Sequence, residues 1–223
     1  SGSITQLATG TISASALGII ASAGAVAVNL APNAITTLAG SSATDLFVTN
    51  SQSLTVNQVA GDGFWSPTQA GLTALNSIRL TATTITANEN VTAPDLVLVS
   101  TNGAFQWTSR YIASNSVRIQ ATGNVTQTAP MVTPTLGIRS SGGLITLTDT
   151  ANDVSTLAGS AAATLRYVDT NSLTVGQVTS LGDFSTTTSG LTAPTTDLSL
   201  GALATGTLTV THAISATDLV LNN

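Results

Sequence analysis

Carboxylates are the side chains of this sequence best suited to chemistry, because two or three that converge can act as general acid and base. The 223-residue chain has ten acidic residues, and Asp149 and Asp153 are the closest pair. The set is Asp45, Asp62, Glu89, Asp95, Asp149, Asp153, Asp169, Asp183, Asp197 and Asp218. Most stand beside Thr, Asn or Gly, where an Asp side chain caps a turn of its own backbone. We therefore predict no catalytic residue, and a polysaccharide-binding or polysaccharide-cleaving enzyme is the alternative.

The sequence contains few residues that could bind a metal or a cofactor. His212 is the only histidine and there is no cysteine, so zinc motifs and disulfide frameworks are excluded. The sequence contains no nucleophile elbow, phosphate loop or dinucleotide-binding fingerprint. We expect no cofactor and no metal site.

Aromatic residues are the best candidates for contact with a ligand. Phe64 and Trp65 lie in a stretch rich in Gly and Pro, and Trp107 and Tyr111 lie in a second aromatic cluster. An exposed Trp can stack on a sugar or bury itself in a partner protein. The alternative is that these rings cover the protein's own wall. Trp65 corresponds to Phe184 in the internal repeat described below, and a retained aromatic ring fits packing slightly better.

The charge content limits the classes of partner. Only 7% of the residues are charged, the five basic residues are all Arg, and the formal net charge is -5. Nucleic-acid binding needs clustered Lys or Arg, so it is excluded. Hydrophobic residues make up 42% of the chain, which argues for a folded core rather than disorder.

The sequence contains a long internal repeat. Residues 33–59 (NAITTLAGSSATDLFVTNSQSLTVNQV) and 152–178 (NDVSTLAGSAAATLRYVDTNSLTVGQV) are identical at about half their positions, with a constant offset of 119 residues. With small slips, GSITQ at Gly2 matches GNVTQ at Gly123, and DLVL at Asp95 matches DLVL at Asp218. The chain is therefore one continuous structure of nearly two repeat units, about 2–120 and 121–223.

Short strands recur within each unit. Segments of three to five residues alternate aliphatic with polar side chains, as in Ile78-Arg79-Leu80 and Leu173-Thr174-Val175. Aliphatic positions recur about every 20 residues, a period typical of one coil of a β-solenoid. We predict an all-β parallel β-helix of about eleven coils with little or no α-helix. Outward Thr and Asn can form hydrogen-bonded ladders on its surface.

One apolar stretch, from Ala14 to Ala31, has a composition that suggests a membrane span. Its counterpart in the second unit contains Arg139 and Asp149, which are costly in a bilayer. Because both copies should share one fold, we predict no membrane insertion.

The repeated pattern GSITQ, NAITTLAG and SLTVNQV, with its second copy GNVTQ, NDVSTLAG and SLTVGQV, resembles the repeat regions of filamentous-haemagglutinin-like bacterial adhesins of the two-partner secretion kind. The resemblance covers most of the chain. It implies a right-handed parallel β-helix that is secreted, at the cell surface or in an extracellular filament. It also implies a role in cell adhesion or self-assembly. The expected partners are other copies of the chain, or glycans and proteins of host or neighbouring cells.

Two further expectations concern the surface and the ends of the predicted solenoid. Pairs of Thr separated by one residue occur at Thr126, Thr146, Thr186 and Thr207, which suggests an ice-binding face as a weaker alternative. The first-unit counterparts of these pairs are not Thr pairs, which counts against it. Neither terminus shows a capping helix, so we expect a segment of a longer array or a subunit that stacks end to end.

Overall fold

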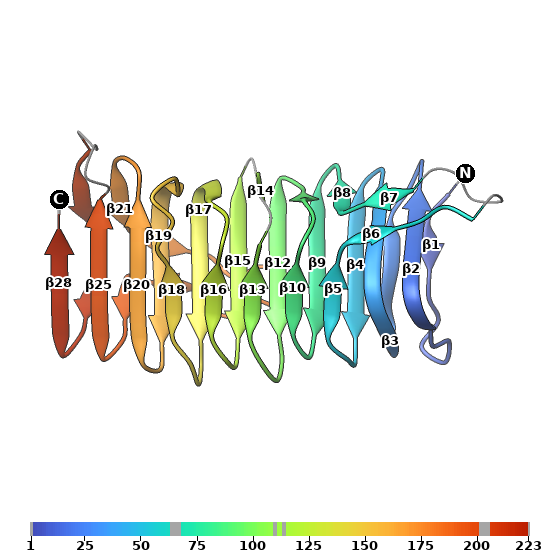
Figure 1. Ribbon diagram of the computed structural model, residues 1–223, viewed down its shortest axis with the longest axis horizontal. Coiled ribbons are helices and arrows are strands. Elements are labelled where there is room, and N and C mark those ends of the chain that lie inside the picture. Colours follow the sequence, from blue (N-terminus) through green and yellow to red (C-terminus); the bar gives the residue numbers. More distant parts are fainter. Residues whose placement is uncertain (1, 63–67, 109–110, 113–114, 201–205, 223) are drawn as a thin grey trace.

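The protein is described by a computed structural model that covers residues 2–62, 68–108, 111–112, 115–200 and 206–222. The chain winds into an elongated stack of strands with the two termini at opposite ends (Figure 1). The described residues contain no helix, and their strands form a parallel β-solenoid of about 10 turns. The predicted all-β solenoid is confirmed.

Two long sheets form the opposite walls of the solenoid, and the long strand β3 (Val26–Ser42) belongs to both. Sheet A also contains β1 (Ile4–Thr5), β4 (Asp45–Asn50), β9 (Ser77–Ala82), β12 (Asp95–Ser100), β14 (Tyr111–Ile112), β15 (Ser116–Ala121), β17 (Met131–Ser140), β19 (Asp153–Ala161), β21 (Leu173–Val175), β24 (Leu191–Thr192), β26 (Leu208–Val210) and β27 (Ile214–Ser215). Sheet B also contains β2 (Ser13–Ala21), β5 (Leu54–Val56), β8 (Leu72–Ala74), β10 (Ile85–Ala87), β11 (Val91–Thr92), β13 (Phe105–Trp107), β16 (Val125–Gln127), β18 (Ile145–Leu147), β20 (Thr164–Asp169), β25 (Thr195–Leu200) and β28 (Asp218–Asn222). All described strand pairs within these two sheets are parallel.

Side chains along each strand point alternately inward and outward, and the inward ones fill the core. In β9, Ile78 and Leu80 are fully buried, whereas Arg79 between them is half-buried on the outer surface. Parallel pairing in register stacks each inward residue on its counterpart in the next coil, as Ile78 stacks on Leu96. The core is therefore a continuous, mostly aliphatic column that also holds the buried rings of Phe105, Trp107 and Tyr167. On the outside of sheet B the same pairing aligns Thr55 with Thr86, and Thr126 with Thr146.

Two hairpins leave this regular winding, and we call them straps. The N-terminal strap (described residues 58–62 and 68–70) contains the antiparallel pair β6 (Gln58–Val59) and β7 (Gln69–Ala70). The C-terminal strap (residues 177–189) contains β22 (Gln177–Val178) and β23 (Thr188–Ser189). Each strap uses residues without adding a coil. The solenoid therefore has about 10 turns rather than the eleven that an average spacing of 20 residues suggested.

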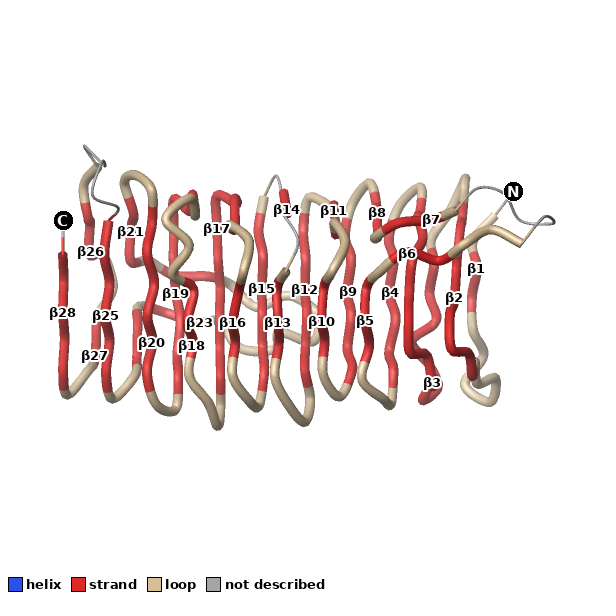
Figure 2. Tube along the Cα trace, in the orientation of Figure 1, coloured by secondary structure: helices blue, strands red, loops and turns tan. Residues whose placement is uncertain are grey.

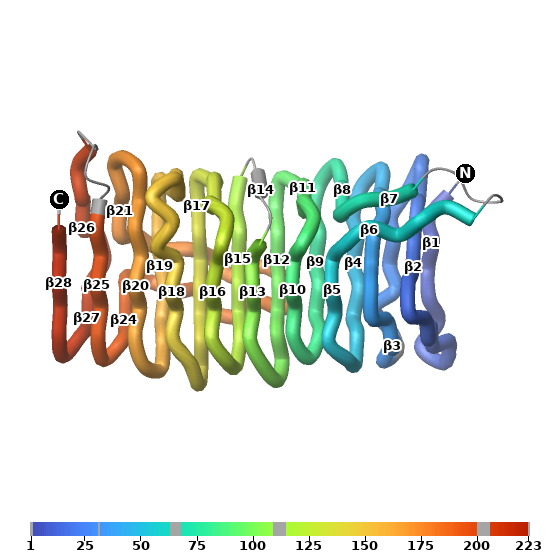
Figure 3. The backbone as a smooth tube through the Cα atoms, in the orientation of Figure 1, coloured from blue at the N-terminus to red at the C-terminus, as the bar shows by residue number. Residues whose placement is uncertain are grey.

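Equivalent strands of the two repeat units lie on opposite walls. The five strands β5, β10, β13, β16 and β18 stack in turn above the sheet-B part of β3, and the chain then crosses to β19 in sheet A. Residues 119 positions apart are thus separated by five and a half turns. As a result, the two straps cross opposite faces: the cyan N-terminal strap passes in front of the blue strands and the orange C-terminal strap passes behind the green and yellow ones (Figure 3).

Buried amides occupy matching positions in the two repeat units. Asn33 accepts a hydrogen bond from Gln6 Nε2 at 2.6 Å and donates to the carbonyl of Thr49 at 2.9 Å. In the second unit Asn152 accepts from Gln127 Nε2 at 2.8 Å and donates to the carbonyl of Val168 at 3.0 Å. Because buried polar groups need partners, each Asn–Gln pair fixes the relative position of neighbouring coils.

The apolar stretch from Ala14 to Ala31 forms strand rather than helix. Its residues lie largely in β2 and at the start of β3. Among the described residues, no helix is long and apolar enough to cross a membrane.

Candidate interaction surface

The four aromatic candidates for ligand contact differ in where they lie in the structure. Trp107 is fully buried and stacks on Phe105, with 6.2 Å between the ring centroids. The prediction that Trp107 offers an exposed ring is therefore wrong, because alternation in β13 turns both rings into the core. Phe64 and Trp65 lie outside the described residues. Tyr111 belongs to β14, whose backbone pairs with β17, and its side chain is also outside the described part.

The acidic residues make structural hydrogen bonds, either within a turn or to a neighbouring strand. Asp149 accepts a hydrogen bond from the amide of Ala151, and Asp153 accepts one from Asn171 Nδ2, both at 2.9 Å. Asp45 accepts from the hydroxyl of Ser77 in the paired strand. Over the described residues, no three His, Asp or Glu side chains gather into a possible metal site. The lone His212 contacts the hydroxyl of Thr211 through Nδ1 at 3.2 Å.

The Thr pairs of the ice-binding alternative do not share one face. Thr126 and Thr146 are neighbours on sheet B, but Thr209 lies in β26 on sheet A. Thr188 lies in the C-terminal strap. A flat array of these pairs is therefore not formed.

The C-terminal strap makes a tertiary contact that the repeat alone does not reveal. Its residue Phe184 is fully buried, in a small apolar cluster with Val97 and Val99 of β12 and with Leu181 of the strap itself. Val97 and Val99 face outward from sheet A, so in a bare solenoid they would meet water. The strap covers them, and its Asp183 accepts a hydrogen bond from the hydroxyl of Thr81 in β9.

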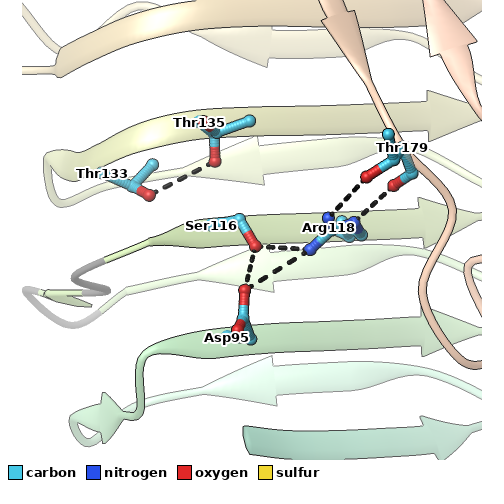
Figure 4. A network of polar contacts seen from close by, with 6 residues as sticks. All are labelled: Asp95, Ser116, Arg118, Thr133, Thr135 and Thr179. Atoms are coloured by element: carbon cyan, nitrogen blue, oxygen red, sulfur yellow. Dashed lines mark hydrogen bonds and ion pairs between the residues drawn. The ribbon is translucent and has the colours of Figure 1, made fainter.

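Arg118 of β15 is the polar centre of this contact (Figure 4). Its Nε donates to the carbonyl of Thr179 in the strap at 2.7 Å, and its Nη1 donates to the hydroxyl of Ser116. The ion pair to Asp95 is 3.8 Å long, and Ser116 in turn donates to the Asp95 carboxylate. Burial lowers the pKa of Arg118, and the charge of Asp95 opposes that shift. Arg118 thus joins β12, β15 and the strap.

Small residues make room for the strap where it leaves sheet A. A Cβ atom at Gly137 would lie 2.8 Å from Cγ1 of Val178 and 3.3 Å from Cζ of Phe184. Ala158, the next residue in the same outward row, is fully buried. The row runs through Arg79, Val97, Arg118, Gly137 and Ala158 in register. The strap follows this row down the rod, away from the coil in which it starts.

The strap therefore connects the two repeat units. It belongs to the second unit, whereas Thr81, Val97, Val99 and Arg118 belong to the first. Four successive strands of sheet A beneath it, β9, β12, β15 and β17, are contacted by strap side chains or backbone. Contacts across several coils oppose sliding and separation of those coils.

A shallow groove of about 230 Å³ lies beside this row on sheet A. Its lining includes the outward residues Gln120, Arg139 and Ser160, which are paired in register. A guanidinium can bind a carboxylate through two hydrogen bonds, and amide and hydroxyl groups offer further donors and acceptors.

The sequence held a partial signal for the strap. The correspondence between Trp65 and Phe184 favoured packing over ligand binding, and Phe184 does pack against the protein. The roles of Thr179, Asp183 and Arg118 were not predicted, because their partners lie 61 to 102 residues away along the chain. Comparison with known proteins gave no match to a family model, to a curated protein or to a solved structure.

Proposed function

We propose that this chain is a rigid rod segment of a secreted bacterial surface protein of the filamentous-haemagglutinin-like kind. Its work is mechanical and adhesive. The rod holds contact surfaces at a distance from the cell or within an extracellular filament, and it contacts copies of itself or glycans and proteins of other cells.

The observation that carries the proposal is the unbroken parallel ladder, reinforced by a strap across several coils. Each coil is hydrogen-bonded to the next along the rod axis and shares one aliphatic core with it, so bending or stretching the rod must break many contacts together. The resemblance of the repeated motifs to adhesin repeats supports the same role. Few charged side chains interrupt the walls, which suits contact through shape rather than through ion pairs.

Negative-stain electron microscopy of the purified chain tests the rod. We expect straight, unbranched particles whose smallest unit is about 50 Å long, from about 10 turns at the spacing of paired strands. Adhesion is tested by binding of fluorescently labelled protein to cells and to a glycan array, with heat-unfolded protein as the control. Compact round particles would contradict the rod, and absence of binding to any surface would contradict the adhesive role.

A further inference from the structure

The shallow groove on sheet A lies within the body of the rod, away from both ends. Its wall is formed by β12, β15, β17 and β19, which stand side by side (Figure 2). One outward row crosses the groove, in which Gln120 pairs with Arg139 and Arg139 pairs with Ser160. Val99 belongs to the same row and also packs against Phe184, so the C-terminal strap borders the groove. The paired strands thus fix the spacing of the polar groups in the groove.

Arg139 supplies the positive charge of this groove, and no described residue forms a hydrogen bond or an ion pair with its guanidinium. The other three arginines that the structure describes each have a partner within the chain. Arg118 binds the strap, Arg166 forms an ion pair, and Arg79 lies over an aromatic ring. A guanidinium keeps its charge at neutral pH and offers five donors. Arg139 is therefore available to bind an anion from outside the chain.

Gln120 adds a buried acceptor beside this cation. Its Oε1 atom is buried and accepts no hydrogen bond from any described residue. Because a buried polar atom without a partner is costly, this atom favours a bound molecule that donates a hydrogen bond to it. Gln120 and Arg139 are neighbours in register. One ligand can therefore donate to Gln120 and accept from Arg139.

The rest of the lining favours a ligand that carries many hydroxyl groups. Five of the nine lining residues have a hydroxyl: Ser100, Thr101, Thr122, Ser141 and Ser160. No described residue forms a hydrogen bond with the hydroxyls of Thr122, Ser141 or Ser160. The described lining contains no Asp or Glu, although the chain has ten acidic residues, so an anion in the groove meets no like charge there. One guanidinium balances the charge of one carboxylate, whereas a phosphate group carries more charge at neutral pH.

An acidic peptide matches this groove less well than a sugar. An extended peptide gains much of its affinity by adding a strand to an exposed sheet edge. Each of the four strands of the wall is already paired on both sides, so the groove offers no free edge. The groove volume of about 230 Å³ is below the roughly 300–1,000 Å³ of pockets that enclose a drug-sized ligand. It therefore suits one sugar ring of a longer chain that continues over the surface.

We propose that the groove binds a uronic acid residue of an acidic polysaccharide. The carboxylate of the sugar accepts two hydrogen bonds from the guanidinium of Arg139, and a hydroxyl group of the same sugar donates to Gln120 Oε1. The Ser and Thr hydroxyls of the lining bind the other hydroxyl groups of the sugar. This inference rests on the proposed adhesive function and names the class of glycan that the rod contacts.

Isothermal titration calorimetry with trigalacturonate tests the site. We expect saturable binding to the unaltered chain and binding at least tenfold weaker for Arg139→Gln. Gln120→Glu should weaken binding to a similar extent, because the new carboxylate pairs with Arg139 and repels the ligand. Arg166→Gln is the matched control: it removes the same charge from an exposed position on sheet B, and the dissociation constant should change less than twofold. Far-ultraviolet dichroism verifies that each variant is folded. Equal weakening in Arg139→Gln and Arg166→Gln would overturn the site.

Three further ligands distinguish the chemical class. The methyl ester of trigalacturonate has the same shape without the charge, and we expect it to bind at least tenfold more weakly. A triglutamate peptide that binds as tightly as trigalacturonate would overturn the saccharide assignment, and a sulfated trisaccharide that binds more tightly would overturn the carboxylate assignment. Absence of trigalacturonate binding would overturn the groove as a uronate site. Straight rods and binding to cells or other glycans would in that case leave the proposed function intact, so the two failures are distinguishable.

Discussion

Single buried polar residues set where the coils bend. Asn50 accepts a hydrogen bond from the amide of Ile35 at 2.7 Å, and Asp169 at the equivalent position accepts one from Val154 at 3.0 Å. Asp169 also accepts from the hydroxyl of Tyr167 at 2.7 Å. At this equivalent position the first unit thus has an amide and the second unit has a carboxyl group. Burial raises the pKa of Asp169, and these hydrogen bonds only partly oppose that effect.

This difference predicts a pH dependence of stability. The folded protein binds the Asp169 proton more tightly than the unfolded chain, so the free energy of unfolding falls as pH rises from the unfolded-state pKa, about 3.9, through the raised folded-state pKa. Asp169→Asn, which copies Asn50, should remove this fall. Urea unfolding at several pH values measures it. Asp62→Asn, at an exposed position, is the control and should keep the slope of the unaltered chain.

At the scale of the elements, each strap is a β-hairpin that is stabilised by tertiary contact. The antiparallel pair β22–β23 is two residues long in each strand, too short to be stable alone. Burial of Phe184 against Val97 and Val99 and the hydrogen bonds of Arg118 hold it on sheet A. The solenoid beneath has its own continuous core, separate from the apolar cluster under the strap.

Phe184→Ala should therefore release the strap before it unfolds the rod. Loss of a buried aromatic side chain typically costs about 3–5 kcal/mol. We expect amide hydrogen exchange of residues 179–183 to accelerate at least a hundredfold, with exchange in β15 and β17 slowed as in the unaltered chain. Ser185→Ala, at an exposed strap position, should change neither region. Uniform acceleration over the whole rod in Phe184→Ala would show that strap and solenoid unfold as one unit.

At the scale of the whole molecule, ion pairs contribute little to the stability of the rod. Among the described residues two ion pairs are formed, and the one between Arg166 and Asp197 is exposed and 3.9 Å long. Exposed ion pairs contribute little to stability and are screened by salt. Stability comes instead from the aliphatic column and from hydrogen bonds between coils.

Rod stability and rod association should consequently change little with ionic strength. Between about 0.05 and about 0.5 M NaCl, a range over which exposed charges become strongly screened, we expect the sedimentation profile and the urea midpoint to stay nearly constant. Sodium sulfate at equal ionic strength is the contrasting arm, since it strengthens burial of apolar surface and should promote association. A steep loss of association with NaCl alone would assign the contacts to charge.

The sequence alone determined the parallel solenoid, its two repeat units and its lack of helix. These are local and periodic properties: alternation of aliphatic and polar residues sets each strand, and a spacing near 20 residues sets the coil. The same alternation could have predicted the burial of Trp107. Gln106 points outward, so Phe105 and Trp107 on either side of it point into the core.

Only the tertiary structure decided where the straps lie and which units they join. An offset of 119 residues corresponds to five and a half turns. The extra half-turn moves each strand of the second unit to the wall opposite its first-unit counterpart, and it depends on how many residues the N-terminal strap removes from the winding. The contacts of Phe184 and Arg118 follow from that rotation. These contacts join residues that are distant along the chain. Which residues meet depends on the number of coils between them, and a local sequence pattern does not contain that information.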